Sequence, residues 1–208
     1  AATHASARTT TPFPLSPRDG LAFSTYFPNG IAHSPDGRFL SFHSMRGGSS
    51  GRDIFVMPAE GGRAVQVATS PADDRSPAWS GDGRSLAWYD GLSPDSGILV
   101  SSQNDDGSWS PPRRYAAPFG ATDPLWDPSR KIDFSPNGGL YRLDPETGAV
   151  SQVLRSAEVG SGVLTVLPVP AIGACSPDWR TVYMILVGPT GTRIVEATPP
   201  SSTLRTLA

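Results

Sequence analysis

The segment from Gly30 to Phe42 reads GIAHSPDGRFLSF and has the pattern of two short strands joined by a tight turn. Pro35 presets φ for the first corner of a type I turn, and Gly37 can take the positive φ that follows. On both sides of the turn, apolar residues alternate with small or polar residues, as they do in half-buried strands. The segment therefore predicts a β-hairpin whose chain reverses between Ser34 and Arg38.

Three further segments repeat this hairpin. They read SPAWSGDGRSLAW from Ser76 to Trp88, DPLWDPSRKIDF from Asp123 to Phe134, and GACSPDWRTVYM from Gly173 to Met184. The equivalent turn positions Ser34, Ser80, Asp127 and Ser176 are separated by 46, 47 and 49 residues. This spacing fits a propeller blade of roughly 40–50 residues.

Three positions of the repeat hold residues of similar chemistry in all four copies. The first position holds His33, Trp79, Trp126 and Cys175, the second Leu40, Leu86, Ile132 and Val182, and the third Phe42, Trp88, Phe134 and Met184. We expect His33 and the three tryptophans to be packed core residues. The third copy lacks the turn glycine and the fourth has Trp179 in its place, so we expect these two units to be less regular.

A third and a fourth strand are expected after each hairpin. The third strands begin at Ile54, Ile98, Leu140 and Ile194, and the fourth at Ala64, Arg113, Val150 and Thr203. This pattern predicts an all-β fold, a small β-propeller of four blades with four antiparallel strands each. We expect one domain over residues 1–208, with blades at approximately 26–74, 75–122, 123–170 and 171–208. Within residues 1–25, the stretch LSPRDGLAFS from Leu15 predicts a strand that closes the ring.

The composition agrees with short strands and excludes several classes of protein. Only 4 Glu and 1 Lys are present, so the common residues of helix surfaces are nearly missing. The net charge of −2 and the scattered arginines argue against nucleic-acid binding. The longest apolar stretch, residues 162–175, is too short for a membrane span. One cysteine excludes an intramolecular disulfide, and the Ala/Thr-rich start favours a secreted or periplasmic protein over a cytoplasmic one.

The repeat resembles the TolB-like family of WD-like propeller repeats. The resemblance rests on SPDGRFLSFHS from Ser34, DIFVM from Asp53 and the glycine pair after Glu60, and on SGDGRSLAWYD from Ser80. The stretch DGSWSPPRRY from Asp106 is also similar to a hairpin of this family. The resemblance implies a propeller used for protein docking, for ligand capture, or as an accessory domain of an enzyme.

Three other motifs have a structural reading beside a functional one. The sequence GGSSG from Gly47 matches the nucleophile elbow of serine hydrolases, but no helix is predicted after it. His33 and His43 are expected several residue pairs apart in the hairpin, which is too far for a shared metal. The oxygens at residues 104–106 suit calcium, although a solvated hairpin tip is the more ordinary interpretation.

In a propeller, the loops before the first strand and after the second strand of each blade converge on one face. We expect this face to bind a polar small ligand or a partner protein. The candidate ligand-binding residues are Asn29, Arg46, Arg52, Arg75, Tyr89, Asp90 and Asp123. The sequence thus favours a non-catalytic recognition or scaffold protein with no cofactor, and an oligomer if the ring is incomplete.

The alternative is a propeller enzyme of the lactonase, glycan-lyase or hydrolase type. In that reading Asn29, Asp90 and Asp123 hold a divalent cation, such as calcium, at the axial channel. The sequence assigns no catalytic residue to either hypothesis.

Overall fold

The computed structural model describes residues 30–45, 51–68, 72–91, 96–117, 121–136, 140–154, 165–167, 182–188, 191–197 and 204–206. Within these ranges the chain forms sixteen β-strands and no helix, which confirms the prediction of an all-β protein. Accordingly, no helix in the described part of the chain is long and apolar enough to cross a bilayer.

The strands form four antiparallel sheets of four strands each, in which neighbours in the sheet are neighbours in the sequence. The first sheet contains β1 (Ile31–His33), β2 (Phe39–Ser44), β3 (Asp53–Pro58) and β4 (Val65–Ala68), and the second β5 (Asp74–Trp79), β6 (Ser85–Asp90), β7 (Gly97–Ser102) and β8 (Arg113–Ala116). The third contains β9 (Ala121–Trp126), β10 (Ile132–Pro136), β11 (Leu140–Leu143) and β12 (Val150–Leu154), and the fourth β13 (Thr165–Leu167), β14 (Val182–Gly188), β15 (Gly191–Ala197) and β16 (Leu204–Thr206). Each sheet has the connectivity of a propeller blade.

The registers of the first three hairpins confirm the alignment of the repeat. His33 lies opposite Leu40, Trp79 opposite Leu86, and Trp126 opposite Ile132. The same pair of repeat positions is therefore opposed in each sheet, as a repeated hairpin requires.

The tips of these hairpins are stabilised by the turn chemistry expected from the sequence. Gly37 and Gly83 have φ values of 71° and 69°. In the third copy Arg130 takes this left-handed conformation with φ 64°, while the Asp127 carboxylate accepts a hydrogen bond from the Lys131 backbone N–H at 2.9 Å. This side-chain bond supports the turn that lacks a glycine. The β9–β10 register shifts between Asp133 and Ser135, and the β5–β6 register of the second copy also shifts, between Arg75 and Ala78, so such a shift does not distinguish the third copy from the second.

The fourth sheet differs from the prediction at its first strand. The strand paired with β14 is Thr165–Leu167, with Thr165 opposite Val187, and not Gly173–Cys175. Residues 173–175 lie outside the described part of the chain. Thr165 and Val166 are β-branched, which suits this segment to a strand.

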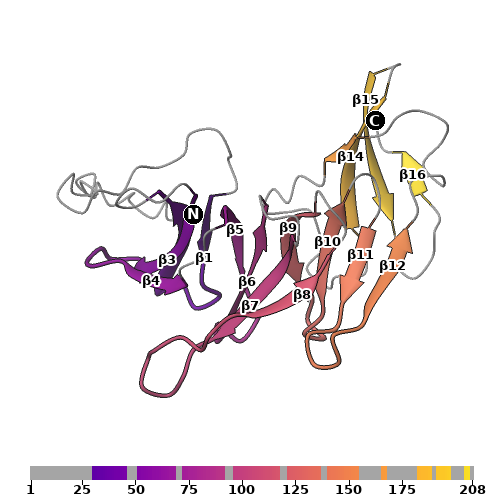
Figure 1. The fold of residues 1–208 in the computed structure, drawn as a ribbon. Coiled ribbons are helices and arrows are strands. Elements are labelled where there is room, and N and C mark those ends of the chain that lie inside the picture. The colour runs from indigo at the N-terminus through magenta and orange to yellow at the C-terminus, as the bar shows by residue number, and fades with distance from the viewer. Residues whose placement is uncertain are drawn as a thin grey trace, which may run out of the picture.

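The first three sheets pack against their sequence neighbours through apolar faces. Ile54 and Val56 of the first sheet pack with Leu86 and Trp88 of the second in one core cluster. A second cluster joins Tyr89, Ile98 and Tyr115 of the second sheet to Trp126 and Phe134 of the third. Figure 1 shows the sheets in sequence order, with the first and fourth at opposite ends of the row. The closing strand predicted within residues 1–25 lies outside the described residues, so ring closure stays a prediction.

His33 corrects one expectation about the core. Trp79 packs against the first sheet and donates an indole hydrogen bond to the Ala32 carbonyl at 3.3 Å, and Trp126 is buried against the second sheet. His33 occupies the equivalent position but is exposed. The reason is that this position faces the preceding sheet, and no described sheet precedes the first one.

Candidate functional site

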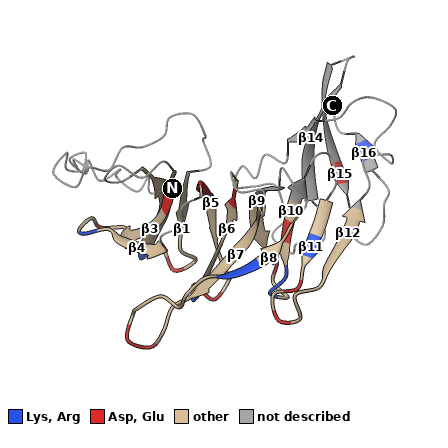
Figure 2. Cartoon of the chain, in the orientation of Figure 1, with Lys and Arg blue, Asp and Glu red and all other residues tan. Residues whose placement is uncertain are grey.

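Charged side chains gather where the first strand of a sheet begins and the second strand ends. Asp74 at the start of β5 lies opposite Asp90 at the end of β6, and Ser44 at the end of β2 lies opposite Asp53. Figure 2 shows the acidic residues at these ends of β3, β5 and β6. We call the following set the charged face: Arg52, Asp53, Asp73, Asp74, Arg75, Asp90 and Arg114.

Asp73 is the centre of one ion-pair network. Its carboxylate accepts hydrogen bonds from the Arg52 backbone N–H and from the Arg52 guanidinium, both at 3.0 Å. The guanidinium of Arg75 also donates to Asp73, through Nε at 2.5 Å. The start of β3 is thereby tied to the start of β5, and a backbone bond from Asp74 N to the Arg52 carbonyl adds to this link at 2.9 Å.

Asp74 and Asp90 form a facing pair of carboxylates, both fully buried. Asp90 is ion-paired with Arg114 of β8. The indole N–H of Trp88 lies near Asp74 and favours its charged form, but it makes no hydrogen bond of normal geometry to either carboxylate oxygen. Burial is the main cause that raises the pKa of Asp74 to about 7, and repulsion from Asp90 adds to it, whereas Trp88 and Arg114 oppose it.

Gly97 explains how Arg114 reaches Asp90. Asp90 lies opposite Gly97 on β7, and Gly97 lies opposite Ala116 on β8. A Cβ atom at position 97 would lie 3.4 Å from the Cγ of Arg114 and only 2.4 Å from the carbonyl oxygen of Tyr115. The missing side chain lets β8 lie close to β7, so that the guanidinium can cross to the next strand.

His43 is buried beside this network and is neutral. Its Nδ1 accepts a hydrogen bond from the Ser76 backbone N–H at 3.3 Å. Burial lowers the pKa of His43 to about 4, and the positive charge of Arg52 contributes. The backbone N–H of His43 donates to the Gly30 carbonyl, whereas His33 pairs with Leu40 near the turn at the other end of the hairpin. The two histidines are therefore not placed to share a metal.

The charged face has an acidic interior and a basic exterior. The side chains of Asp73 and Asp90 are 5% and 0% exposed, while those of Arg75 and Arg114 are 25% and 38% exposed. The groups that solvent or a ligand can reach are therefore guanidinium groups held by buried carboxylates. Such groups recognise carboxylates and phosphates through paired hydrogen bonds.

The structure brings together three of the predicted ligand-binding residues, Arg52, Arg75 and Asp90. Tyr89 is instead buried in the core cluster between the second and third sheets. Asn29 and Arg46 lie outside the described residues, as does the side chain of Asp123. Arg114 was missed, because it lies in a strand with a weak sequence signal. The available signal in the sequence was Gly97, the glycine at the position paired with Asp90.

The remaining motifs have simple structural roles or are not described. The serine of GGSSG lies at residue 49, outside the described residues. Residues 104–106 form a hairpin tip, where the Asp106 carboxylate accepts hydrogen bonds from Ser108 and the Asn104 side-chain amide donates one to the Ser108 hydroxyl. Among the described residues, no group of three or more His, Cys, Asp or Glu side chains is placed to hold a metal ion. The cation site at Asn29, Asp90 and Asp123 stays a prediction.

Comparison with known proteins gives matches at the level of fold. No family model matches the sequence, and no curated protein matches it. TolB from Acinetobacter baumannii superposes with a TM-score of 0.63 at 14% identity, over 86% of this chain and 43% of that one. A putative TolB from Agrobacterium tumefaciens gives 0.66 at 17% identity, over 90% of this chain and 67% of that one.

A structure of a nidogen/laminin complex also matches, with a TM-score of 0.62 at 14% identity, over 86% of this chain and 63% of that one. The chain thus spans about two fifths to two thirds of the length of these structures. These similarities show a β-propeller fold.

Proposed function

We propose that this propeller is a non-catalytic recognition module that binds a partner protein through an acidic segment docked on the charged face. One observation carries the proposal. Arg75 and Arg114 are partly exposed, and each is fixed by a buried carboxylate on a strand end. Guanidinium groups held in this way lose little side-chain entropy on binding, so they are suited to recognise carboxylates of a partner.

The position of these groups supports the same conclusion. They lie on the two outer strands of the second sheet, β5 and β8, and the core clusters on both sides of this sheet are packed. A rigid framework that presents charged groups from strand ends is typical of binding surfaces. The matched complex of nidogen with laminin is an example of a protein with this fold in a protein assembly. A secreted or periplasmic location stays a prediction.

Selection of peptides on the immobilised protein tests the proposal. Random peptides are displayed on phage, and the enriched sequences are synthesised for titration. We expect enrichment of peptides with Asp and Glu, and we expect Arg75→Gln or Arg114→Gln to weaken their binding roughly 10-fold, the value of one charge-assisted hydrogen bond. Binding is measured at a temperature at which melting curves show each variant folded.

Arg84→Gln is the matched control. Arg84 is also an arginine near an aspartate, but its side chain is 69% exposed and lies at a hairpin tip at the other end of the second sheet. It should leave peptide binding unchanged. If no acidic peptides are enriched, or if they bind all three variants as tightly as the unchanged protein, the charged face is not the binding surface.

A further inference from the structure

A pocket of about 240 Å³ lies between the second and third sheets, at the hairpin ends and away from the charged face. It is lined by residues of β6, β7, β8 and β9 and by two turns of the third sheet: Ser85, Val100, Ser102, Ser110, Pro111, Arg113, Tyr115, Trp126, Arg130, Pro145 and Glu146. This volume is below the roughly 300–1,000 Å³ of sites for drug-sized ligands, so it suits a molecule the size of one sugar ring.

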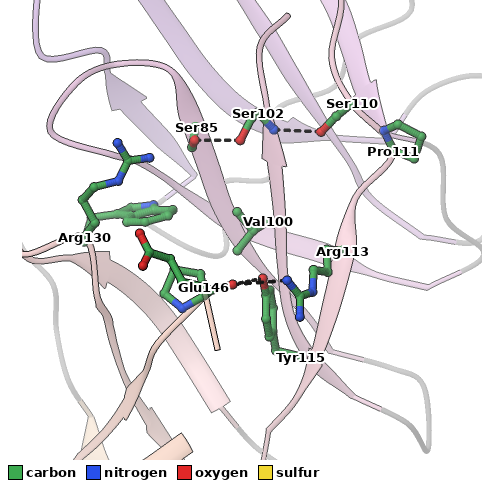
Figure 3. A pocket seen from close by; sticks show the side chains of 11 residues that line it. Ser85, Val100, Ser102, Ser110, Pro111, Arg113, Tyr115, Arg130 and Glu146 are labelled. Atoms are coloured by element: carbon green, nitrogen blue, oxygen red, sulfur yellow. Dashed lines mark hydrogen bonds between the residues drawn. The ribbon is translucent and has the colours of Figure 1, made fainter. Parts of the chain in front are cut away.

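Arg113 and Tyr115 form one wall of the pocket, as Figure 3 shows. The Arg113 guanidinium lies over the Tyr115 ring at 4.8 Å from its centre, and the Tyr115 hydroxyl donates to the Pro145 carbonyl at 2.6 Å. Arg113 donates one long hydrogen bond, at 3.4 Å, to the same carbonyl. These contacts fix the orientation of the guanidinium plane beside the pocket.

Arg113 differs from the other arginine of the pocket in its charge partner. Arg130 is ion-paired with Asp82 at 2.9 Å. Within the described ranges, Arg113 has no carboxylate within ion-pair distance. The fixed guanidinium therefore offers paired N–H donors to an anion in the pocket.

Trp126 supplies aromatic surface to the pocket. It is 5% exposed and lines the pocket, and its indole nitrogen is buried. The part of Trp126 that a ligand can reach is therefore its ring, against which the carbon skeleton of a ligand can pack.

Hydroxyl groups cover the opposite part of the pocket. The hydroxyls of Ser85 and Ser102 are 2.8 Å apart, and Ser110 accepts a hydrogen bond from the Ser102 backbone N–H. Val100 lies between these serines and Tyr115 (Figure 3). The pocket thus combines the Arg113 guanidinium, serine hydroxyls, and apolar and aromatic surface with the ion-paired Arg130 and the Glu146 carboxylate within one small volume.

We propose that this pocket binds a small hydroxylated carboxylic acid, a sugar acid, with its carboxylate on Arg113 and its hydroxyls on the serines. Arg113 selects the carboxylate, the serines select hydroxyls, and Val100, Tyr115 and Trp126 contact the carbon skeleton. This site is separate from the charged face and goes beyond the proposed function. A failure at either site leaves the other unaffected.

Nuclear magnetic resonance titration with D-glucuronate tests the site, and D-glucose is the matched neutral probe with the same ring. The readout is the indole N–H signal of Trp126, identified among those of the five tryptophans by its loss in Trp126→Phe. We expect saturable movement of this signal with glucuronate, and binding of glucose roughly 10-fold weaker or less. Equal binding of the two sugars, or no shift with either at millimolar concentration, would overturn the proposal.

Arg113→Gln tests the assigned residue, since it removes the charge at an exposed position with little effect on the core. It should weaken glucuronate binding roughly 10-fold and leave the weaker glucose binding unchanged. Arg84→Gln should leave both unchanged. If glucuronate binds Arg113→Gln and the unchanged protein equally, the carboxylate is not held by Arg113 and the proposal is wrong.

Discussion

Replacing Asp74 by Asn should change how the stability of this protein depends on pH. Asp74 has no exposed surface, faces Asp90 and accepts no hydrogen bond of normal geometry. Its pKa is about 7 in the folded protein, against 3.8 for an ordinary aspartate. Each unit of pKa difference corresponds to about 1.4 kcal/mol, so ionising Asp74 destabilises the fold by roughly 4 kcal/mol.

The sign follows from which state binds the proton. Between about pH 4 and pH 7 the unfolded chain has lost the proton of Asp74 while the folded protein keeps it, so stability decreases as pH rises. The stability that Asp74 contributes by keeping its proton is fully present below its pKa in the unfolded chain and is lost as pH rises through its pKa in the folded protein. Asn cannot ionise, and its amide can donate to the unpaired oxygen of Asp90. The stability of Asp74→Asn relative to the unchanged protein should therefore increase by roughly 4 kcal/mol from pH 4 to pH 8.

Urea unfolding of both proteins across this pH range measures the difference between their free energies of unfolding. The other groups titrate in both proteins, so their contributions cancel in this difference. Asp105→Asn is the matched control, because the Asp105 side chain is 97% exposed, and its curve should follow that of the unchanged protein. Parallel curves for Asp74→Asn and the unchanged protein would refute the reasoning, because they would mean that Asp74 ionises equally easily in both states.

Three further changes have expected outcomes. Arg114→Gln leaves Asp90 buried without its ion pair and should lower the free energy of unfolding by roughly 1–3 kcal/mol, measured by urea at neutral pH; an unchanged midpoint would contradict the ion pair. Gly97→Ala places a Cβ against the Tyr115 carbonyl and should cost about 1–3 kcal/mol in the same assay, with Gly81→Ala as the comparison, because a Cβ at position 81 meets nothing within 4 Å. If Asn29, Asp90 and Asp123 hold a cation, a chelator should lower the melting temperature and calcium should restore it; no change with either would exclude that site.

The sequence determined the sheets because their signals are local. Alternating apolar residues and Pro-Asp-Gly turns act within about a dozen residues, and they predicted the hairpins and the alignment of the repeat, which the registers of the first three hairpins confirm. The fourth sheet shows the limit of such signals. Its turn segment at Ser176 matched the repeat, but the strand that pairs with β14 is Thr165–Leu167, which the repeat pattern did not predict.

Only the tertiary structure decided which charges meet. Arg52 and Asp73 are joined across two sheets, and Arg114 reaches Asp90 over a glycine on the strand between them. Burial is also decided by the tertiary structure. One repeat position holds Trp79, Trp126 and His33, and these side chains differ in burial because different parts of the protein cover them. Ion pairs and burial depend on how sheets stack, and this is set by the summed packing of residues far apart in the chain, which no local pattern encodes.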